Sequence, residues 1–281
     1  MLPAFALAQK TNGIVLDSVT EKPIPYVSIW IENEDTSAMA DSLGQYSIKT
    51  TNANKTLVFS AAGYHNKKAK LPETRGLKLR PIGFPECAPR TKKTESVRIG
   101  NDYNIRRSDL TFGSEGKPWM LARKFAAPAN LEKTPFLDKV TLYTDCHNNN
   151  MKLALRFFSI DENGQPGREL TDRLVIFRVD NGRENTTVDL SSYNIAFPKN
   201  GIFVAVAWLI IPQNVKHWYD KRPMAFKDYD PGVGAMPADE NSTWEYSGGR
   251  WAEMKRFPAK YDMRSFRGKF AEIAMQLTLS N

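Results

Sequence analysis

Short segments rich in β-branched and aromatic residues recur along this chain, and turn-forming residues separate them at intervals of roughly 8–12 residues. In residues 25–31, for example, Tyr26, Ser28 and Trp30 alternate with Val27, Ile29 and Ile31. A period of two places alternate side chains on opposite faces of a strand. The spacing therefore predicts an all-β protein built from sandwiches.

Length and composition limit the number of such units. The chain has 281 residues, more than the roughly 100–200 of a typical domain, so we expect two packed units. Hydrophobic residues make up 41% and charged residues 25%, which is typical of globular proteins and excludes disordered or collagen-like chains. The longest apolar run, residues 201–211, is shorter than the ~20 residues of a membrane-spanning helix and is predicted to be a buried strand.

The first unit is expected to contain strands at 13–16, 25–31, 45–48, 56–60 and 77–79. Asp41 is suited to accept hydrogen bonds from backbone N–H groups just after it, and Gly44 to take a positive φ, which together close a tight hairpin. Gly63 fits another bend. These positions are interpreted as structural.

Four ordered blocks in this unit also resemble a known family. Residues 12–80 are similar to the carboxypeptidase-like regulatory domain, which implies a small transthyretin-like or immunoglobulin-like sandwich of the kind found in exported proteins of Gram-negative bacteria. The resemblance departs from the family pattern at Ser37 to Ala40. It implies an accessory domain and no peptidase activity. The matching blocks are Gly13-Ile-Val-Leu-Asp17, Pro23-Ile-Pro-Tyr-Val-Ser-Ile29, Asp41-Ser-Leu-Gly-Gln-Tyr46 and Leu57-Val-Phe-Ser-Ala-Ala-Gly-Tyr64.

Residues 81–130 are broken by prolines and glycines and are predicted to be a linker that adds edge strands at 97–99 and 120–125. The expected organisation is therefore a signal-peptide remnant at 1–8, the regulatory-like domain at 9–80, this linker, and a second sandwich at 131–281.

The second unit should be a larger, jelly-roll-like sandwich. Leu153, Leu155 and Phe157 share one face of a strand opposite Lys152 and Arg156, which predicts one solvent-facing side. Residues 202–211 are apolar on both faces and are expected to be central. Asn-Gly pairs in 161–164 and 180–182 predict hairpin turns. The expected strands are 136–144, 152–160, 173–179, 186–190, 202–211 and 270–279.

Residues 156–167, with 188–190 and 203–208 after them, are also similar to the β-sandwich that often follows the regulatory-like domain in exported proteins without an assigned activity. This family has no established site to carry over.

The net charge argues against nucleic-acid binding. Thirty-nine Lys and Arg against 31 Asp and Glu give +8. The excess is +3 in residues 10–80, +4 in 81–130 and +1 in 131–281, so it is not concentrated in the patch that a phosphate backbone requires.

The first residues indicate export. An apolar segment ending in Ala6-Leu7-Ala8 resembles a signal-peptide cleavage site, which predicts the periplasm, the outer-membrane surface or the extracellular space. The alternative is an apolar tail or a first strand. Cys87 and Cys146 have no zinc-binding or redox spacing; they are either a disulfide or two unpaired thiols.

No catalytic or metal constellation is recognised, and no cofactor is expected. His65, His147 and His217 lack the H-x-x-E and H-E-x-x-H patterns of zinc peptidases, and no G-x-S-x-G elbow is present. Asp161, Glu162 and Asp172 lie near one predicted hairpin, where a structural turn is favoured over a calcium site or a catalytic carboxylate pair.

The aromatic-rich region 212–268 is the candidate binding site. Exposed aromatic rings on a rigid β scaffold offer flat faces for sugars or peptide segments. The alternative interpretation is that these rings cover the core or fix a long loop. The candidate ligand-binding residues are Trp218, Tyr219, Tyr229, Trp244, Tyr246 and Trp251.

The leading hypothesis is a non-enzymatic, exported cell-envelope module that binds a glycan or an envelope protein and has no membrane span. One alternative is a glycan-directed hydrolase whose fold brings together carboxylates such as Asp161, Asp228 and Asp230 at about 5–10 Å. Another is a purely structural surface protein.

Overall fold

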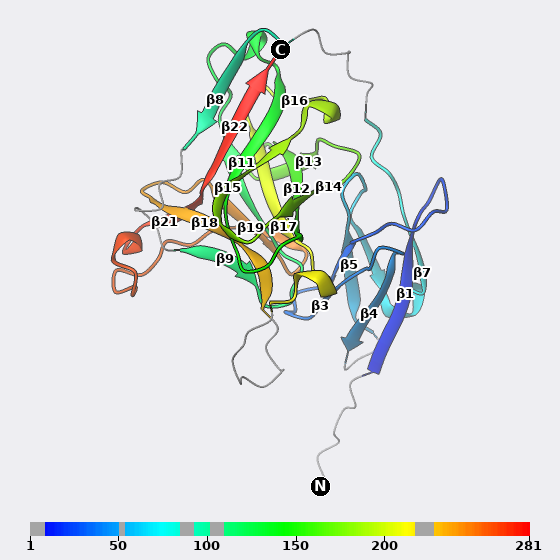
Figure 1. Cartoon of the computed structure of the whole chain (residues 1–281). Helices are drawn as coiled ribbons and strands as arrows, with labels where there is room; N and C mark the ends of the chain where they lie inside the picture. The colour runs from blue at the N-terminus through cyan, green and yellow to red at the C-terminus, as the bar shows by residue number, and fades with distance from the viewer. Residues whose placement is uncertain (1–8, 51–53, 85–92, 102–109, 217–227) are drawn as a thin grey trace.

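A computed structural model describes residues 9–50, 54–84, 93–101, 110–216 and 228–281. It consists of a small N-terminal sandwich beside a larger one, so the predicted all-β fold is confirmed (Figure 1). None of the helices in these ranges has the length and apolar character needed to span a bilayer.

The small sandwich has two sheets. One sheet has the order β4-β1-β7, with β1 and β7 parallel, and the other has the order β3-β2-β5-β6. Its strands are β1 (Gln9–Asp17), β2 (Ser28–Ile31), β3 (Ser37–Met39), β4 (Gln45–Thr50), β5 (Thr56–Ser60), β6 (Lys67–Lys70) and β7 (Gly76–Leu79), and a short 3-10 helix, η1 (Leu71–Glu73), precedes β7.

The hairpin before β4 forms as predicted. The Asp41 carboxylate accepts hydrogen bonds from the backbone N–H groups of Leu43 at 2.8 Å and Gln45 at 2.9 Å, and Gly44 has a φ of 71°. This turn sets the register of β4, in which Tyr46 and Ile48 point into the small core. The short β3 and the lysine-rich edge strand β6 were not predicted, because neither has an apolar face long enough to show a period.

Strand β2 is shorter than predicted. Tyr26 has a φ of 55°, which is incompatible with extended backbone, so the strand begins at Ser28. All four of its residues are buried. Ile29 and Ile31 fill the small core, so the burial of Ser28 and Trp30 means that the opposite face of β2 is covered as well.

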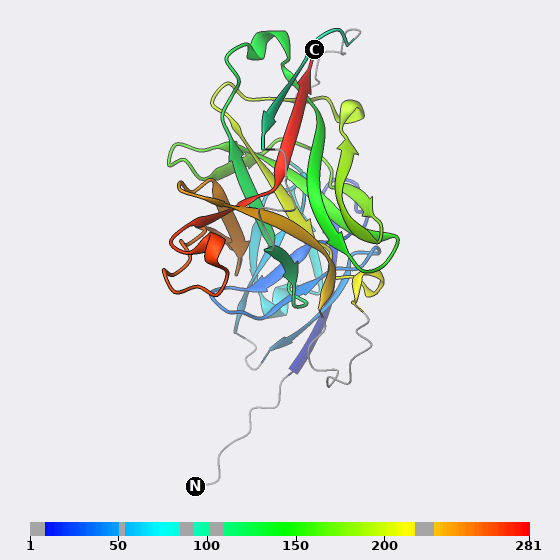
Figure 2. The same cartoon turned by 60° about the vertical axis from the view of Figure 1, so that its left-hand side comes forward.

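The large sandwich consists of a seven-stranded and an eight-stranded sheet (Figure 2). The first has the order β13-β12-β17-β10-β19-β20, with β14 on β12, and comprises β10 (Met120–Phe125), β12 (Met151–Ile160), β13 (Pro166–Glu169), β14 (Val175–Val179), β17 (Ile202–Trp208), β19 (Thr243–Ser247) and β20 (Arg250–Glu253).

The eight-stranded sheet has the order β21-β18-β11-β22-β8, with β15 and β16 on β11 and β9 on β18. Its strands are β8 (Ser96–Gly100), β9 (Thr111–Ser114), β11 (Phe136–Cys146), β15 (Gly182–Asp189), β16 (Ile195–Ala196), β18 (Tyr229–Ala238), β21 (Phe270–Ile273) and β22 (Met275–Ser280). Single 3-10 turns are η3 (Leu131–Lys133), η4 (Ser191–Tyr193), η5 (Pro212–Asn214) and η6 (Arg264–Phe266).

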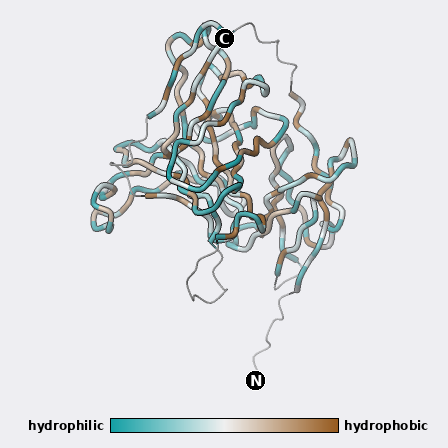
Figure 3. The backbone as a smooth tube through the Cα atoms, in the orientation of Figure 1, coloured by the Kyte–Doolittle hydropathy of each residue, from teal (hydrophilic) through white to brown (hydrophobic). Residues whose placement is uncertain are grey.

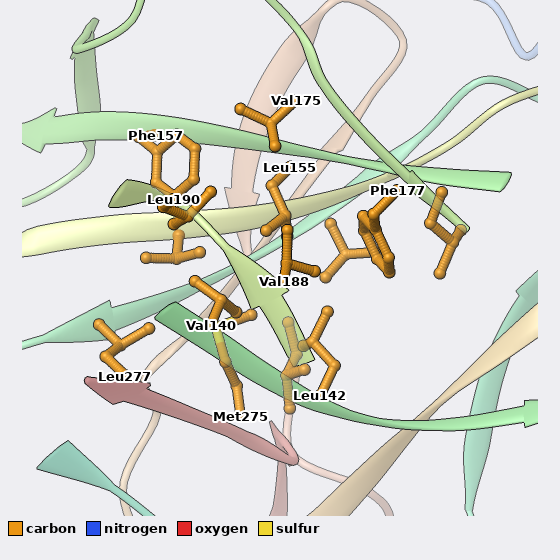
Figure 4. Packing of buried hydrophobic residues seen from close by; sticks show 14 of the residues in the cluster. Val140, Leu142, Leu155, Phe157, Val175, Phe177, Val188, Leu190, Met275 and Leu277 are labelled. Carbon is orange, nitrogen blue, oxygen red and sulfur yellow. The ribbon is translucent and has the colours of Figure 1, made fainter. Parts of the chain in front are cut away.

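The main core lies between these two sheets. Leu155 and Phe157 from one sheet belong to the same buried cluster as Val140 and Leu277 from the other (Figure 4). Along the backbone, hydrophobic segments run through the body of the molecule and hydrophilic ones cover many of the outer turns (Figure 3). Every residue of β17 is buried and it pairs on both edges, which confirms the predicted central strand.

Three local predictions differ from the structure. Strand β8 is an edge strand as expected, but β10 lies between β17 and β19 in the middle of its sheet, and both strands belong to the second sandwich. The predicted strand 270–279 breaks at Ala274 into β21 and β22, which pair with different strands. The Asn-Gly turn at 180–182 carries the chain from one sheet to the other and closes no hairpin, because β14 pairs with β12 while β15 pairs with β11.

The prediction that β12 has a solvent-facing side is wrong. Arg156 is only 5% exposed, because the β2–β5 sheet of the small sandwich covers this face. The four sheets therefore stack in one series, with an apolar layer between each neighbouring pair.

Cys146 belongs to the main core and is a free thiol, whose Sγ donates a hydrogen bond to the Asn148 carbonyl at 3.1 Å. Burial raises the pKa of this thiol to about 11. Its partner in the disulfide alternative, Cys87, lies outside the described residues.

Candidate ligand cleft between the sandwiches

The contact between the two sandwiches is formed by the outer face of the seven-stranded sheet. Tyr26 and Met39 of the small sandwich pack against it, and the backbone N–H of Ile210 points at the Met39 sulfur at 3.2 Å. The turn between β19 and β20 approaches β5 so closely that a Cβ on Gly249 would meet Val58 at 2.9 Å. The β19–β20 hairpin, which contains the candidate ligand-binding residues Trp244 and Trp251, is thus part of this contact.

A buried ion pair lies within the contact. The Arg156 Nε and Nη2 atoms donate to the two carboxylate oxygens of Glu169 at 2.9 and 2.8 Å, and Nη1 donates to Ser60 Oγ at 3.1 Å. Burial alone would lower the pKa of Arg156, but the Glu169 carboxylate keeps it above its ordinary value. This pair connects β12 and β13 to the end of β5.

The segment after β5 fits tightly against the large sandwich at Gly63. This residue has a φ of 81°, and a Cβ placed on it would lie 2.1 Å from the carbonyl oxygen of Asp172. Its N–H donates to Glu169 at 3.3 Å. Only glycine allows this conformation and this approach together.

The contact is incompletely filled, and a cleft of about 400 Å³ opens beside the ion pair. We call it the inter-domain cleft. Its small-sandwich wall is formed by residues just after Gly63, and its large-sandwich wall by the outer face of β12, the β13 region and the β19–β20 hairpin. The side chains that define it are Tyr64, His65, Asn66, Phe158, Arg168, Tyr246 and Trp251.

Aromatic rings dominate one wall of the inter-domain cleft. Tyr246 and Trp251 are direct cross-strand neighbours with ring centroids 5.1 Å apart, and Trp251 meets the edge of Phe158 at 5.3 Å. Trp251 is half-buried. Tyr246 is 3% exposed, and its hydroxyl lies near Ser60 without a hydrogen bond of normal geometry. The wall thus presents an indole together with a buried, unsatisfied phenol.

The opposite wall is more polar. Tyr64 is held by a hydrogen bond from its hydroxyl to the Asp17 carboxylate at 2.8 Å, and burial, together with this carboxylate, raises the pKa of Tyr64 to about 12. His65 and Asn66 are exposed, and the Arg80 guanidinium donates to the His65 Nε2 atom at 3.4 Å. Apolar faces on one side and polar groups on the other are typical of small-ligand sites.

The six aromatic residues that were predicted to bind a ligand do not form one site in the structure. Tyr246 and Trp251 line the inter-domain cleft, but Trp244 is buried beneath it, where it contacts Phe203 at 6.2 Å. Tyr229 lines a different cavity. Trp218 and Tyr219 lie outside the described residues. Another ring of the 212–268 region, Tyr261, stacks on Phe257 and fixes its own loop.

Sequence reasoning missed part of the cleft. Phe158 and Arg156 share a strand face, and this shared face is the only sequence signal that could have indicated a covered surface there. Nothing in the sequence links Tyr64 or His65 to the β19–β20 hairpin, because about 180 residues separate them.

The second cavity is polar and has a volume of about 420 Å³. Asp228 and Asp230 line it together with Tyr229. Asp230 is buried, accepts a hydrogen bond from the His147 N–H at 3.1 Å and lies 3.8 Å from Lys216 Nζ. Two of the three carboxylates of the hydrolase alternative therefore share one cavity.

The third carboxylate, Asp161, does not reach it. Asp161 closes the predicted turn by accepting from the N–H groups of Asn163 and Gln165 at 2.9 and 2.8 Å, and Gly164 has a φ of 77°. Its predicted neighbour Glu162 is exposed in this turn, and Asp172 lies across from Gly63.

The three histidines likewise do not come together in the described part of the chain. His65 lines the inter-domain cleft and His147 the polar cavity, while His217 lies outside the described residues. Among the residues that the structure describes, no three His, Cys, Asp or Glu side chains are grouped so that they could hold a metal ion.

Comparisons with solved structures give two distant similarities. A candidate carbohydrate-binding protein from Bacteroides uniformis has 12% identity and a TM-score of 0.21, over 81% of this chain and 98% of the other. A structure of infectious bursal disease virus has 10% identity and a TM-score of 0.24, over 97% and 79%. At these TM-scores neither similarity defines the fold of the second sandwich.

The comparison with curated proteins gives no match. The comparison with family models matches residues 11–80 to the CarboxypepD_reg-like domain. This agrees with the four sequence blocks, with the two-sheet core of β1–β7, and with the glycine-closed turns at Gly44 and Gly63. The N-terminal sandwich of this protein is therefore a CarboxypepD_reg-like domain.

Proposed function

We propose that this protein is a non-enzymatic binding module that holds a carbohydrate in the inter-domain cleft. The observation that carries the proposal is the wall formed by Trp251, Tyr246 and Phe158, which faces the polar groups of His65 and Asn66 across the cleft. Aromatic faces cover the apolar faces of sugar rings, and polar groups opposite them orient the hydroxyls.

The cleft also has the size and the unused polar capacity for such a ligand. Its volume of about 400 Å³ lies within the usual range of ligand pockets. Among the described residues the buried Tyr246 hydroxyl has no partner in normal hydrogen-bond geometry, and a ligand hydroxyl that bonded to it would remove the energetic cost of leaving it unsatisfied.

The small domain has a defined part in this function. It supplies Tyr64, His65 and Asn66 to the cleft, and the Arg156–Glu169 pair and Gly63 hold it against the large sandwich. The regulatory-like domain therefore forms half of a site whose aromatic half comes from the second sandwich.

The test is a glycan array probed with the full chain and with Trp251→Ala. Loss of every signal in a variant that unfolds at the same temperature as wild type supports the site. Tyr229→Ala is the matched control, because it removes a predicted aromatic that lines the other cavity. If Trp251→Ala binds like wild type and Tyr229→Ala does not, the site is the polar cavity and the proposal is wrong.

Export to the cell envelope is part of the proposal and is supported by the apolar segment that ends in Ala6-Leu7-Ala8. Fractionation of the producing cells tests it. Recovery of the full-length chain only from the cytoplasm contradicts it.

A glycan-directed hydrolase is the second candidate, because Asp228 and Asp230 line one cavity with Glu115 and Asp145. It predicts that the glycans bound on the array are slowly cleaved to new reducing ends and that Asp228→Asn stops the cleavage. Unchanged glycans after prolonged incubation remove this candidate.

A further inference from the structure

The inter-domain cleft does not end at its aromatic wall. A neighbouring hollow of about 530 Å³ shares Arg168 and Glu169 with it, so the two spaces meet at this pair. The neighbouring hollow continues past Arg173 and Tyr193 toward η4. A ligand longer than one sugar ring would therefore pass directly over the Arg168 side chain.

Arg168 is exposed and held in place. Its backbone N–H donates to Ser159 Oγ at 3.0 Å, one guanidinium nitrogen donates to the Gly83 carbonyl, and the guanidinium lies over the Phe84 ring at 5.6 Å. No carboxylate of the described residues lies within ion-pair distance of it. Its charge is positioned by neutral groups, and no carboxylate in the part of the chain that the structure describes neutralises it.

The carboxylates that line the two spaces already have partners. Glu169 is paired with Arg156 in a bidentate geometry, and Asp172 with Arg173 at 3.2 Å. The walls carry three arginines, Arg156, Arg168 and Arg173, against these two carboxylates, a balance of +1 that belongs to Arg168. The Arg173 guanidinium lies over the Tyr193 ring at 5.2 Å, a second ordered cation farther along.

We propose that the carbohydrate bound in the inter-domain cleft is anionic and that Arg168 binds its carboxylate or sulfate group. A guanidinium matches the two oxygens of either group with parallel N–H bonds, and such charge-assisted bonds are stronger than those to a neutral hydroxyl. Trp251 binds the sugar face, and Arg168 selects the charged ring. This inference rests on the proposed function and names its ligand class.

The test measures the affinity of the full chain for matched pairs of probes by calorimetry. Trigalacturonic acid is compared with its methyl ester, and a sulfated galactan oligosaccharide with its desulfated form, so the two pairs distinguish carboxylate from sulfate. We expect one acidic probe to bind about tenfold more tightly than its neutral partner, and this preference to fall as salt rises. Arg168→Gln should abolish the preference and leave the neutral probe unchanged.

The control is Arg178→Gln, which removes a surface arginine that is paired with Asp180 at 2.9 Å and lines neither space. Equal affinity for acidic and neutral probes that still depends on Trp251 overturns the anionic preference but not the carbohydrate site. A preference for acidic probes that survives Arg168→Gln overturns the role of Arg168. Absence of binding to all four probes at about 1 mM contradicts the anionic ligand class, whereas the glycan array decides the carbohydrate site itself.

Discussion

The two faces of the seven-stranded sheet are made by the same strands but differ in what they pack against. The inner face of β12 and β17 presents Leu155, Phe157 and Val206 to a hydrocarbon core. The outer face presents Phe158, several alanines and the charged Arg156 to a second domain. Each layer includes a buried arginine ion pair, Arg123–Glu272 in the inner layer and Arg156–Glu169 in the outer one. The outer layer also leaves hollows large enough for a ligand.

The difference arises from how the two layers are covered. Four of the outer-face positions are alanines, which bring the small sandwich close but fill little space: Ala122, Ala154, Ala205 and Ala207. The hollows around the Arg156–Glu169 pair are therefore features of an interface between domains. Such an interface is where a binding site can be kept without opening a core.

The largest expected effect comes from breaking the buried pair on the outer face. Glu169→Gln leaves the Arg156 guanidinium buried without its carboxylate, and we expect the free energy of unfolding to fall by about 3–5 kcal/mol. Denaturant unfolding measures it. The double variant Arg156→Met/Glu169→Leu should regain most of this loss. A stable Glu169→Gln protein would mean that water reaches the pair and that the interface is open.

Adjacent phenylalanines test the comparison directly. Phe157→Ala removes a fully buried ring from the inner core and should cost about 3–5 kcal/mol. Phe158→Ala removes a ring that borders the inter-domain cleft, where water can fill the space, so a cost of only about 1–2 kcal/mol is expected. Equal losses in the same unfolding experiment would show that the two layers are alike.

A smaller effect is expected from adding one methyl group to the interface. In Gly63→Ala the new Cβ lies against the Asp172 carbonyl at a positive φ, so we expect a loss of about 1–3 kcal/mol. Gly83→Ala is the control, since its Cβ enters open space, and it should change stability by less than about 0.5 kcal/mol. Thermal melting of both variants distinguishes a tight domain contact from a loose one.

The smallest effect is a pH dependence at Tyr64. Its pKa is raised to about 12 in the folded protein, so the unfolded chain releases this proton first as pH rises. The contribution of Tyr64 to the free energy of unfolding is complete below pH ~10 and is lost progressively as the pH rises toward 12. Tyr64→Phe should flatten this part of the stability curve, as measured by unfolding at fixed pH values. An unchanged slope contradicts the assignment.

Much of the fold was predictable because its signals are local. The alternation in β4, the Asp41 and Asp161 turns, and the fully apolar β17 each report on a neighbourhood of a few residues. The Arg156 face of β12 was misread for a physical reason. A period of two shows that a face is polar but cannot show that another domain covers it and that Glu169 neutralises its charge.

Only the part of the candidate site that the β19–β20 hairpin forms was predictable from the sequence. Tyr246 and Trp251 are close in sequence and meet across a Gly-Gly turn, so their hairpin could be recognised. The sequence around Trp244 does not show whether its ring faces solvent, the cleft or the core, and in the structure the ring is buried. The groups from the small sandwich and from β13 come from far along the chain, and only the packing of the domains brings them together.

The most direct test of the account follows the tryptophans by ¹⁹F NMR of the full chain labelled with 5-fluorotryptophan, while the glycan selected on the array is added. Trp251→Phe identifies one resonance, and the buried Trp30 and Trp208 serve as internal references. We predict that the Trp251 resonance shifts and saturates with the ligand while those two stay in place. Saturable binding that leaves the Trp251 resonance unmoved would show that the cleft between the sandwiches is not the binding site.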